Sequence, residues 1–146
     1  MTTKLYDDVL MEHIRNARNY CVLQDPDREA SGTNPLCGDD MTIYIRLAGD
    51  RVQQVAFQCT CCGVSMASAS MMTEAVSGMP ALEVLENVRA FAALLSGSEV
   101  PTTGDVNRRA LLDTVRRFPA RLRCALLPWL TLEAALLGRE HARFTS

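Results

Sequence analysis

Three cysteines and one aspartate carry most of the chemistry that this sequence could perform. Cys37 and Asp39 lie two residues apart in the segment 34–39 (NPLCGD), where proline and glycine favour a tight turn, so both side chains could reach one ion. Cys62 lies beside a predicted helix N-terminus, which attracts anionic groups such as a thiolate. Together with Cys124, these side chains could complete a tetrahedral zinc site, or hold a [2Fe-2S] cluster with the aspartate as a weaker fourth ligand.

A structural role for the cysteines stays open beside metal binding. The chain lacks the paired Cys-x-x-Cys motifs of a zinc ribbon, and a free cysteine often behaves as a small buried hydrophobe. We expect that buried role for Cys21. Alternation along a strand end would put Cys59 and Cys61 on one side and Cys62 on the other, and we interpret Cys59 and Cys61 as accessory thiols.

The remaining polar candidates favour structural interpretations. His13 lies on the apolar face of a predicted helix and His141 lies near the C-terminus, so we expect both to be structural or solvated rather than ligands. Ser65, Ser68 and Ser70 have no histidine nearby in the sequence for nucleophilic catalysis. Their small size indicates close helix packing instead.

Composition limits the class of protein. The chain has 146 residues, of which 48% are hydrophobic, and a formal net charge of -2 without a dense run of lysine and arginine. We therefore expect one domain over residues 1–146 and no nucleic-acid partner. No stretch approaches the ~20 apolar residues of a membrane span, and residues 1–10 lack an apolar signal region, so we expect a cytoplasmic protein with no membrane partner. In such a reducing compartment, cysteines are more often ligands or reactive thiols than disulfides.

The nearest approach to a basic cluster consists of Arg116, Arg117, Arg121 and Arg123, close to Cys124. Such arginines usually form a solvated helix face, but a basic patch beside a reactive cysteine could also dock an acidic partner. We regard Arg121 and Arg123 as the candidates for partner docking.

Hydrophobic periodicity outlines the elements that must position these side chains. Alternating apolar residues predict a β-hairpin with strands over 43–47 and 52–58, whereas the segment 19–40, rich in Asp, Pro, Gly and Asn, indicates a long irregular loop. Apolar residues at helical spacing predict helices over residues 5–19, 64–78, 80–97, 105–118 and 121–137. Asp105 would cap the fourth helix, and Pro128 must kink the last helix or mark its start.

At these positions the sequence resembles the U-type iron-sulfur assembly proteins, the family of IscU, SufU and the N-terminal part of NifU. The resemblance covers nearly the whole chain and rests on these segments: Leu5-Tyr6, residues 34–39 (NPLCGD), Ala56-Phe57, Cys62 with residues 65–72 (SMASASMM), residues 123–125 (RCA), Trp129 and residues 131–133 (TLE). Residues 79–105 resemble the insertion that marks the SufU branch. Arg123 stands where IscU proteins carry a histidine, and their chaperone motif (LPPVK) is absent from residues 118–123, which also favours SufU.

The resemblance implies an α+β fold of the SufE/NifU type, in which a small antiparallel sheet of about three strands packs against several helices. It implies that Cys37, Asp39, Cys62 and Cys124 converge at one exposed end and hold zinc, as in SufU proteins, or a [2Fe-2S] cluster, as in IscU proteins. Cys37 would accept a persulfide sulfur from a pyridoxal-phosphate-dependent cysteine desulfurase of the SufS type. Apo iron-sulfur proteins would receive the product.

Three functions follow as alternatives. The chain could be an assembly protein that accepts sulfur and holds zinc or a nascent cluster. It could instead be a zinc-dependent sulfurtransferase without scaffolding, acting as a persulfide carrier rather than a typical enzyme, or a structural zinc domain. Cys59 and Cys61 depart from the family, which usually has glycines before its second cysteine, and the pair could shift metal preference, ligate a cluster or relay sulfur.

Overall fold

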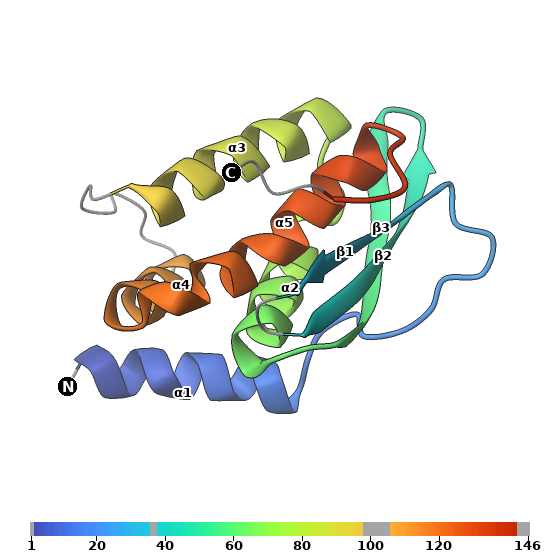
Figure 1. Cartoon of the computed structure of the whole chain (residues 1–146). Helices are drawn as coiled ribbons and strands as arrows, with labels where there is room; N and C mark the ends of the chain where they lie inside the picture. Colours follow the sequence, from blue (N-terminus) through green and yellow to red (C-terminus); the bar gives the residue numbers. More distant parts are fainter. Residues whose placement is uncertain (1, 36–37, 98–105, 143–146) are drawn as a thin grey trace.

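The computed structural model describes residues 2–35, 38–97 and 106–142 and shows an α+β architecture (Figure 1). In chain order, the elements are α1 (Thr2–Arg15), β1 (Arg28–Asn34), β2 (Asp39–Ala48), β3 (Arg51–Thr60), α2 (Gly63–Val76), α3 (Ala81–Ser96), α4 (Val106–Arg117), a 3-10 turn (Pro119–Arg121) and α5 (Leu122–Leu136). The fold class that the resemblance implied is confirmed. None of the helices in the described ranges combines the length and apolar character needed to cross a membrane.

The sheet has the order β1-β2-β3, and both neighbouring pairs are antiparallel. The predicted hairpin forms β2 and β3, where Ile43 pairs with Phe57 and Ile45 pairs with Val55. All four side chains are fully buried, so the alternation of apolar and polar residues accounts for this register. Gly49 supplies the positive φ of 62° in the tight turn between the two strands.

β1 lies within the segment for which we expect an irregular loop, and that expectation is wrong here. The strand pairs with β2 along its whole length. Its inward positions carry Ala30, Gly32 and Asn34, which are small or polar and therefore give no apolar alternation in the sequence. Small residues are needed because α5 crosses this strand closely: a Cβ on Gly32 would collide with the hydroxyl of Thr131.

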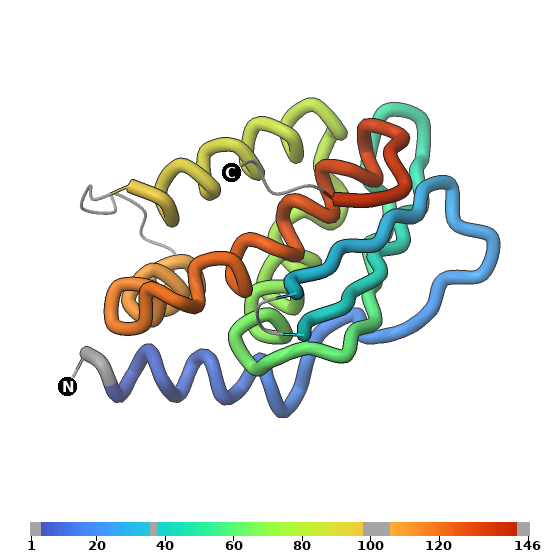
Figure 2. The backbone as a smooth tube through the Cα atoms, in the orientation of Figure 1, coloured from blue at the N-terminus to red at the C-terminus, as the bar shows by residue number. Residues whose placement is uncertain are grey.

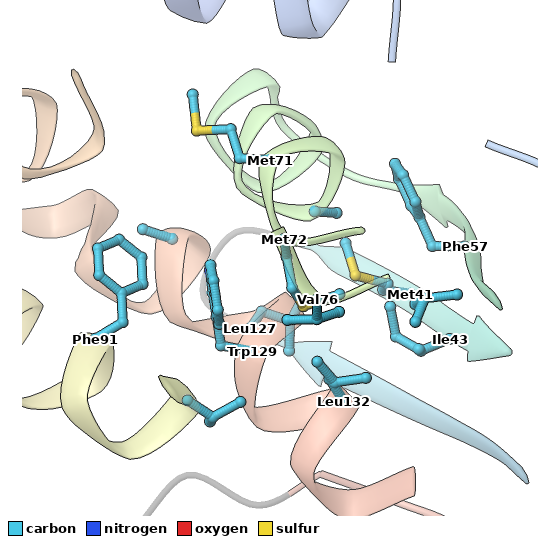
Figure 3. Close-up of a cluster of buried hydrophobic side chains, with 14 of the residues drawn as sticks. Met41, Ile43, Phe57, Met71, Met72, Val76, Phe91, Leu127, Trp129 and Leu132 are labelled. Atoms are coloured by element: carbon cyan, nitrogen blue, oxygen red, sulfur yellow. The ribbon is translucent and has the colours of Figure 1, made fainter. Parts of the chain in front are cut away.

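The helices form layers against the sheet (Figure 1). α5 packs on β1 and β2, and α2 packs on β3 and on α5, while α1, α3 and α4 pack on these two helices. Figure 3 shows the core between the layers, where Met72 and Val76 of α2 lie among side chains from β2 and α5. On the α3 side, Phe91 packs against Trp129 with ring centroids 4.8 Å apart. The sheet, α2 and α5 therefore form the rigid frame of the molecule.

α5 continues through Pro128, so this proline does not mark the start of the helix. Proline has no N–H, and the carbonyl of Cys124, four residues earlier, therefore lacks its usual donor within the helix. The hydroxyl of Ser65 in α2 donates to that carbonyl at 3.0 Å, and Ser68 donates to the next carbonyl, of Ala125, at 2.7 Å. Two serines thus tie α2 to α5 beside a predicted ligand.

The other helices lie close to their predicted ranges. α3 occupies Ala81–Ser96, within the range predicted for it, and α2 ends two residues before the predicted end. The predicted cap Asp105 lies outside the described residues, as do residues 98–104 before it.

Candidate metal centre

Three of the four predicted ligands come together at one end of the sheet. Asp39 begins β2, Cys62 directly precedes α2, and Cys124 lies in the first turn of α5. Their ligand atoms all lie within 4.8 Å of one another. Figure 2 shows the starts of β2 and α2 at the same end of the sheet. The fourth predicted ligand, Cys37, lies outside the described residues.

Two short hydrogen bonds hold the Asp39 carboxylate, one on each oxygen, and the Cys62 thiol donates more weakly to Oδ2 at 3.9 Å. The backbone N–H of Cys62 donates to Oδ1 at 2.8 Å, and the Ser65 hydroxyl donates to Oδ2 at 2.9 Å. The Asp39 side chain is only 2% exposed, so protein donors rather than water set its orientation. Because one of these donors belongs to Cys62, the positions of the two predicted ligands are coupled directly.

Ser65 contacts all three described ligands, although the sequence indicates only a packing role for it. Its fully buried hydroxyl reaches Asp39 Oδ2 and, at 3.0 Å, the carbonyl oxygen of Cys124. The Cys62 thiol donates to Ser65 Oγ over 3.6 Å. The sequence does hold one signal for this role. Ser65 follows Cys62 by three residues, a spacing that places both residues on the same side of α2.

Asn34 is a second contributor that sequence reasoning missed. It ends β1, lies opposite Asp39 in the strand register and is 1% exposed. Its Nδ2 donates to Cys124 Sγ at 3.8 Å, whereas its Oδ1 has no hydrogen-bond partner within the described ranges. Hydrogen-bond donors to a sulfur ligand orient it and tune the metal that it binds. Asn34 therefore belongs to the site, at the start of the segment that contains Cys37.

The donor set fits a metal cation. Cysteine sulfur and carboxylate oxygen are ligands of zinc, and cysteine sulfur is the usual ligand of iron-sulfur clusters. Cys124 is fully buried and Asp39 nearly so, and ionised groups at such positions are costly without a compensating positive charge. A bound cation would supply that charge. The three described ligands leave one corner of a tetrahedral site to a further ligand.

Cys59 and Cys61 form a disulfide, so the interpretation of the pair as free accessory thiols is wrong for this structure. Side chains two residues apart on a strand project from the same face. The Cα atoms are 5.5 Å apart, within the usual range for a disulfide. The alternation that placed both residues on one side of the strand end was the signal for this bond. While it exists, neither sulfur is available as a metal ligand.

Cys21 is exposed, so the expectation of a buried residue is also wrong. Its backbone N–H donates to the carbonyl of Phe57 at 3.1 Å, and Tyr20 forms a parallel bridge with Phe57. This segment therefore lies along the edge of β3 that β2 does not cover, where the side chain faces the surface.

The two histidines are not members of the metal-ligand group found among the described residues. Nδ1 of His13 lies 2.7 Å from Ser70 Oγ, and Nε2 lies 3.3 Å from Asn107 Oδ1. Burial lowers the pKa of His13 below its ordinary value of 6.5, and the positive charge of Arg18 lowers it further. His13 thus has the structural role that we expect, joining α1 to α2 and α4. His141 Nδ1 lies 3.0 Å from the hydroxyl of Ser31.

The arginines near the start of α5 differ in their surroundings. Arg121 and Arg123 are exposed, and their role in docking stays a prediction. Arg117 instead donates to Asp7 Oδ1 at 2.7 Å and to Asp113 Oδ2 at 3.0 Å, so it links α4 to α1.

The starts of β2, α2 and α5 thus bring a carboxylate and two cysteine sulfurs together, and this group on an α+β scaffold could hold a metal ion. The family of the NifU-like N terminal domain matches residues 5–136, and the chain belongs to this family.

Relatives and solved structures agree with this assignment. The "Zinc-dependent sulfurtransferase SufU" of Bacillus subtilis (strain 168) is 38% identical, over 93% of this chain and 92% of its own. The "Iron-sulfur cluster assembly scaffold protein IscU" of Streptococcus pyogenes serotype M1 is 32% identical, over 95% of this chain and 87% of its own. The crystal structure of FiSufU from Fervidobacterium islandicum AW-1 matches with a TM-score of 0.81 at 30% identity, covering 91% of this chain and 97% of that chain.

Proposed function

We propose that the chain is an iron-sulfur cluster assembly protein that accepts sulfur on Cys37 and holds a zinc ion or a nascent [2Fe-2S] cluster on Cys37, Asp39, Cys62 and Cys124. The observation that carries the proposal is the convergence of the last three residues, whose ligand atoms lie within 4.8 Å of one another. Relatives named as a zinc-dependent sulfurtransferase and as a cluster scaffold support its two parts. We assign the function to residues 1–146 as one domain acting in the cytoplasm.

Sulfur would come from a pyridoxal-phosphate-dependent cysteine desulfurase of the SufS type. The Cys37 thiolate attacks the outer sulfur of the enzyme's persulfide, the S–S bond breaks, and the enzyme's thiolate leaves. Exposed Arg121 and Arg123, at the start of α5, would attract an acidic surface of this partner. A bound cation keeps cysteine ligands ionised. Asp39 keeps its orientation during the transfer because its two short hydrogen bonds come from the chain itself, from the Cys62 N–H and from the Ser65 hydroxyl.

Cluster scaffolding is the second candidate, in which the chain builds a cluster and hands it to apo iron-sulfur proteins. The Asn34 donor to Cys124 Sγ favours it, because N–H donors to ligand sulfurs stabilise clusters and tune their potential. A purely structural zinc domain is less well supported. The hydrophobic core extends from β2 and β3 to α3 and α4 without using the ligands Asp39 and Cys62, so the fold has a source of stability apart from the ion.

Metal analysis and a visible absorption spectrum of protein purified without oxygen test the metal part. We expect zinc without colour if sulfur transfer dominates, and iron with sulfide and visible charge-transfer bands if scaffolding dominates. Cys62→Ala should lose the metal, whereas Cys21→Ala removes an exposed cysteine away from the ligands and should keep it. Metal retained at the wild-type level in Cys62→Ala would refute the site.

The sulfur part is tested with a cysteine desulfurase and cysteine as the sulfur source. Mass spectrometry should find one added sulfur on the wild-type chain, located on Cys37. Cys37→Ala should abolish acceptance while the far-ultraviolet circular dichroism spectrum stays unchanged. Acceptance that persists in this variant would remove Cys37 from the role, and unfolding on removal of the metal would return the structural zinc domain as the explanation.

A further inference from the structure

The Cys59–Cys61 disulfide lies beside the metal centre but is separate from the ligand set. Cys59 is the penultimate residue of β3, and Cys61 directly precedes Cys62. Both cysteines are only half-buried, so reagents can approach them.

The bond contributes little to holding the fold together. A disulfide stabilises mainly by restricting the unfolded chain, and this effect shrinks as the closed loop becomes shorter. Here only one residue separates the two cysteines. The end of β3 is also held without it, because Cys59 pairs with Met41 in the sheet and its carbonyl accepts a hydrogen bond from the Tyr20 hydroxyl at 3.0 Å. A chemical role accounts for the pair better than a structural one.

We propose that Cys59 and Cys61 form a reducing dithiol that converts the sulfane sulfur of a persulfide into sulfide, and that the disulfide in the structure is its oxidised product. The outer sulfur of a persulfide is two electrons more oxidised than the sulfide of an iron-sulfur cluster. A dithiol that closes to a disulfide gives up two electrons and two protons. The substrate class, persulfides, rests on the proposed sulfur-transfer function, whereas the disulfide itself does not.

The reaction balances in two displacements. One thiolate of the pair attacks the outer sulfur of a persulfide R–S–SH, the S–S bond breaks, and R–S⁻ leaves, so that this cysteine now carries the persulfide. The second thiolate attacks the cysteine sulfur of that group, and hydrosulfide leaves as the Cys59–Cys61 bond forms. In sum, two thiols and R–S–SH give the disulfide, R–SH and hydrogen sulfide. A dithiol reductant of the Cys-x-x-Cys protein class restores the pair by thiol–disulfide exchange.

The geometry suits the second displacement. The two Cα atoms are 5.5 Å apart and the two sulfurs are bonded in the structure, so the second sulfur reaches the first without movement of the backbone. Both residues are half-buried, and this partial exposure gives an incoming carrier access to the pair. Cysteine persulfide, a small carrier of sulfane sulfur, is the probe for this reaction.

The test uses the full chain, loaded with zinc, reduced with dithiothreitol and freed of reductant without oxygen. Cysteine persulfide is added, released sulfide is measured, and alkylation with mass spectrometry locates the disulfide. We expect one equivalent of sulfide per chain, together with formation of the Cys59–Cys61 bond. The same chain with that bond already formed should release sulfide only at the level of a sample without protein. Exposed Cys21 is the matched control: Cys21→Ser should behave as the wild type.

Serine variants separate the two displacements. Cys59→Ser/Cys61→Ser should release no sulfide above the sample without protein, and Cys61→Ser should keep the transferred sulfur on Cys59 without releasing it. Sulfide release from the double variant equal to the wild type, or release without formation of the disulfide, would overturn the inference. Failure of the proposed function gives a different result. In that case the wild type would accept no sulfur from a desulfurase, and this outcome does not depend on the reaction of cysteine persulfide with Cys59 and Cys61.

Discussion

Replacement of Ser65 by alanine is the sharpest test of how the site is organised. The change removes one hydroxyl that serves two buried acceptors, Asp39 Oδ2 at 2.9 Å and the Cys124 carbonyl at 3.0 Å. A hydrogen bond to a charged group contributes ~1.5–3 kcal/mol, and an unsatisfied buried carbonyl costs ~1–3 kcal/mol. The two losses share one proton and do not add. We therefore expect Ser65→Ala to lower the free energy of unfolding of the metal-free protein by ~2 kcal/mol.

The same change should weaken metal binding, because it frees the Asp39 carboxylate to rotate and loosens the start of α5. Groups that orient metal ligands typically affect affinity by ~10–100-fold. Competition with a chromophoric zinc chelator measures the affinity, and urea unfolding of the metal-free protein measures the stability.

Ser68→Ala is the matched control for this prediction. Ser68 is also fully buried in α2, donates to the Ala125 carbonyl at 2.7 Å and accepts from Trp129 Nε1 at 3.0 Å, but neither of these bonds reaches a ligand side chain. Its loss should lower stability by a similar amount and leave zinc affinity unchanged. Wild-type affinity in Ser65→Ala, or an equal loss of affinity in both variants, would refute the role assigned to Ser65.

Three further predictions follow from the packing. Pro128→Ala gives α5 an N–H that can reach the Cys124 carbonyl, so a double-mutant cycle with Ser65→Ala should show a coupling of ~0.5–1.5 kcal/mol in urea unfolding, and strictly additive losses would contradict this. Gly32→Ala places a Cβ against the Thr131 hydroxyl and should lower the free energy of unfolding by ~1–3 kcal/mol in the same assay. An unchanged free energy of unfolding would mean that α5 can move away, and would contradict this prediction. Because the folded-state pKa of His13 lies below 6.5, the unfolded chain binds more protons below that pH. Stability should therefore be fully present above about pH 6.5 and decrease as the pH falls below it, and equal pH profiles for His13→Asn and wild type would count against this.

Much of the scaffold could be predicted because its elements follow the periodicity of their apolar residues. The β2–β3 hairpin and the helices each bury a regularly spaced apolar face, which the sequence displays directly. β1 could not be predicted in this way, since Ala30, Gly32 and Asn34 face inward for reasons that lie in α5 and in the metal centre. The space available to the side chains of β1 depends on α5, about a hundred residues later in the chain. The sequence pattern within β1 carries no information about that distant helix.

The residues of the site also fall into two groups, those that the sequence identifies and those whose roles depend on contacts between distant elements. Asp39, Cys62 and Cys124 have side chains whose chemistry identifies them, and the family resemblance grouped them before any geometry was known. Ser65 and Asn34 gain their roles only from the contact of distant elements, which brings the Ser65 hydroxyl to the carbonyl of a residue 59 positions away. The disulfide was missed for a different reason. Expectations about a reducing compartment concern the average cysteine, whereas Cys59 and Cys61 lie two residues apart at the end of β3, with Cα atoms close enough for a disulfide.

If the proposed site binds a metal ion, Pro128 explains how thiol protons can be exchanged for the ion with little rearrangement. Without its ion, the centre has two acceptors to satisfy, Asp39 Oδ2 and the Cys124 carbonyl, and two donors that reach them, the Ser65 hydroxyl and the weaker Cys62 thiol, which lies 3.9 Å from Asp39 Oδ2. If Ser65 donates to the carbonyl that the proline leaves unpaired, the thiol proton remains for the carboxylate. Metal binding removes that thiol proton and puts a cation against both Cys62 and Asp39. Ser65 can keep its bond to α5 throughout, so the ion takes the place of the Cys62 proton beside Asp39, while each further cysteine ligand gives up its own thiol proton.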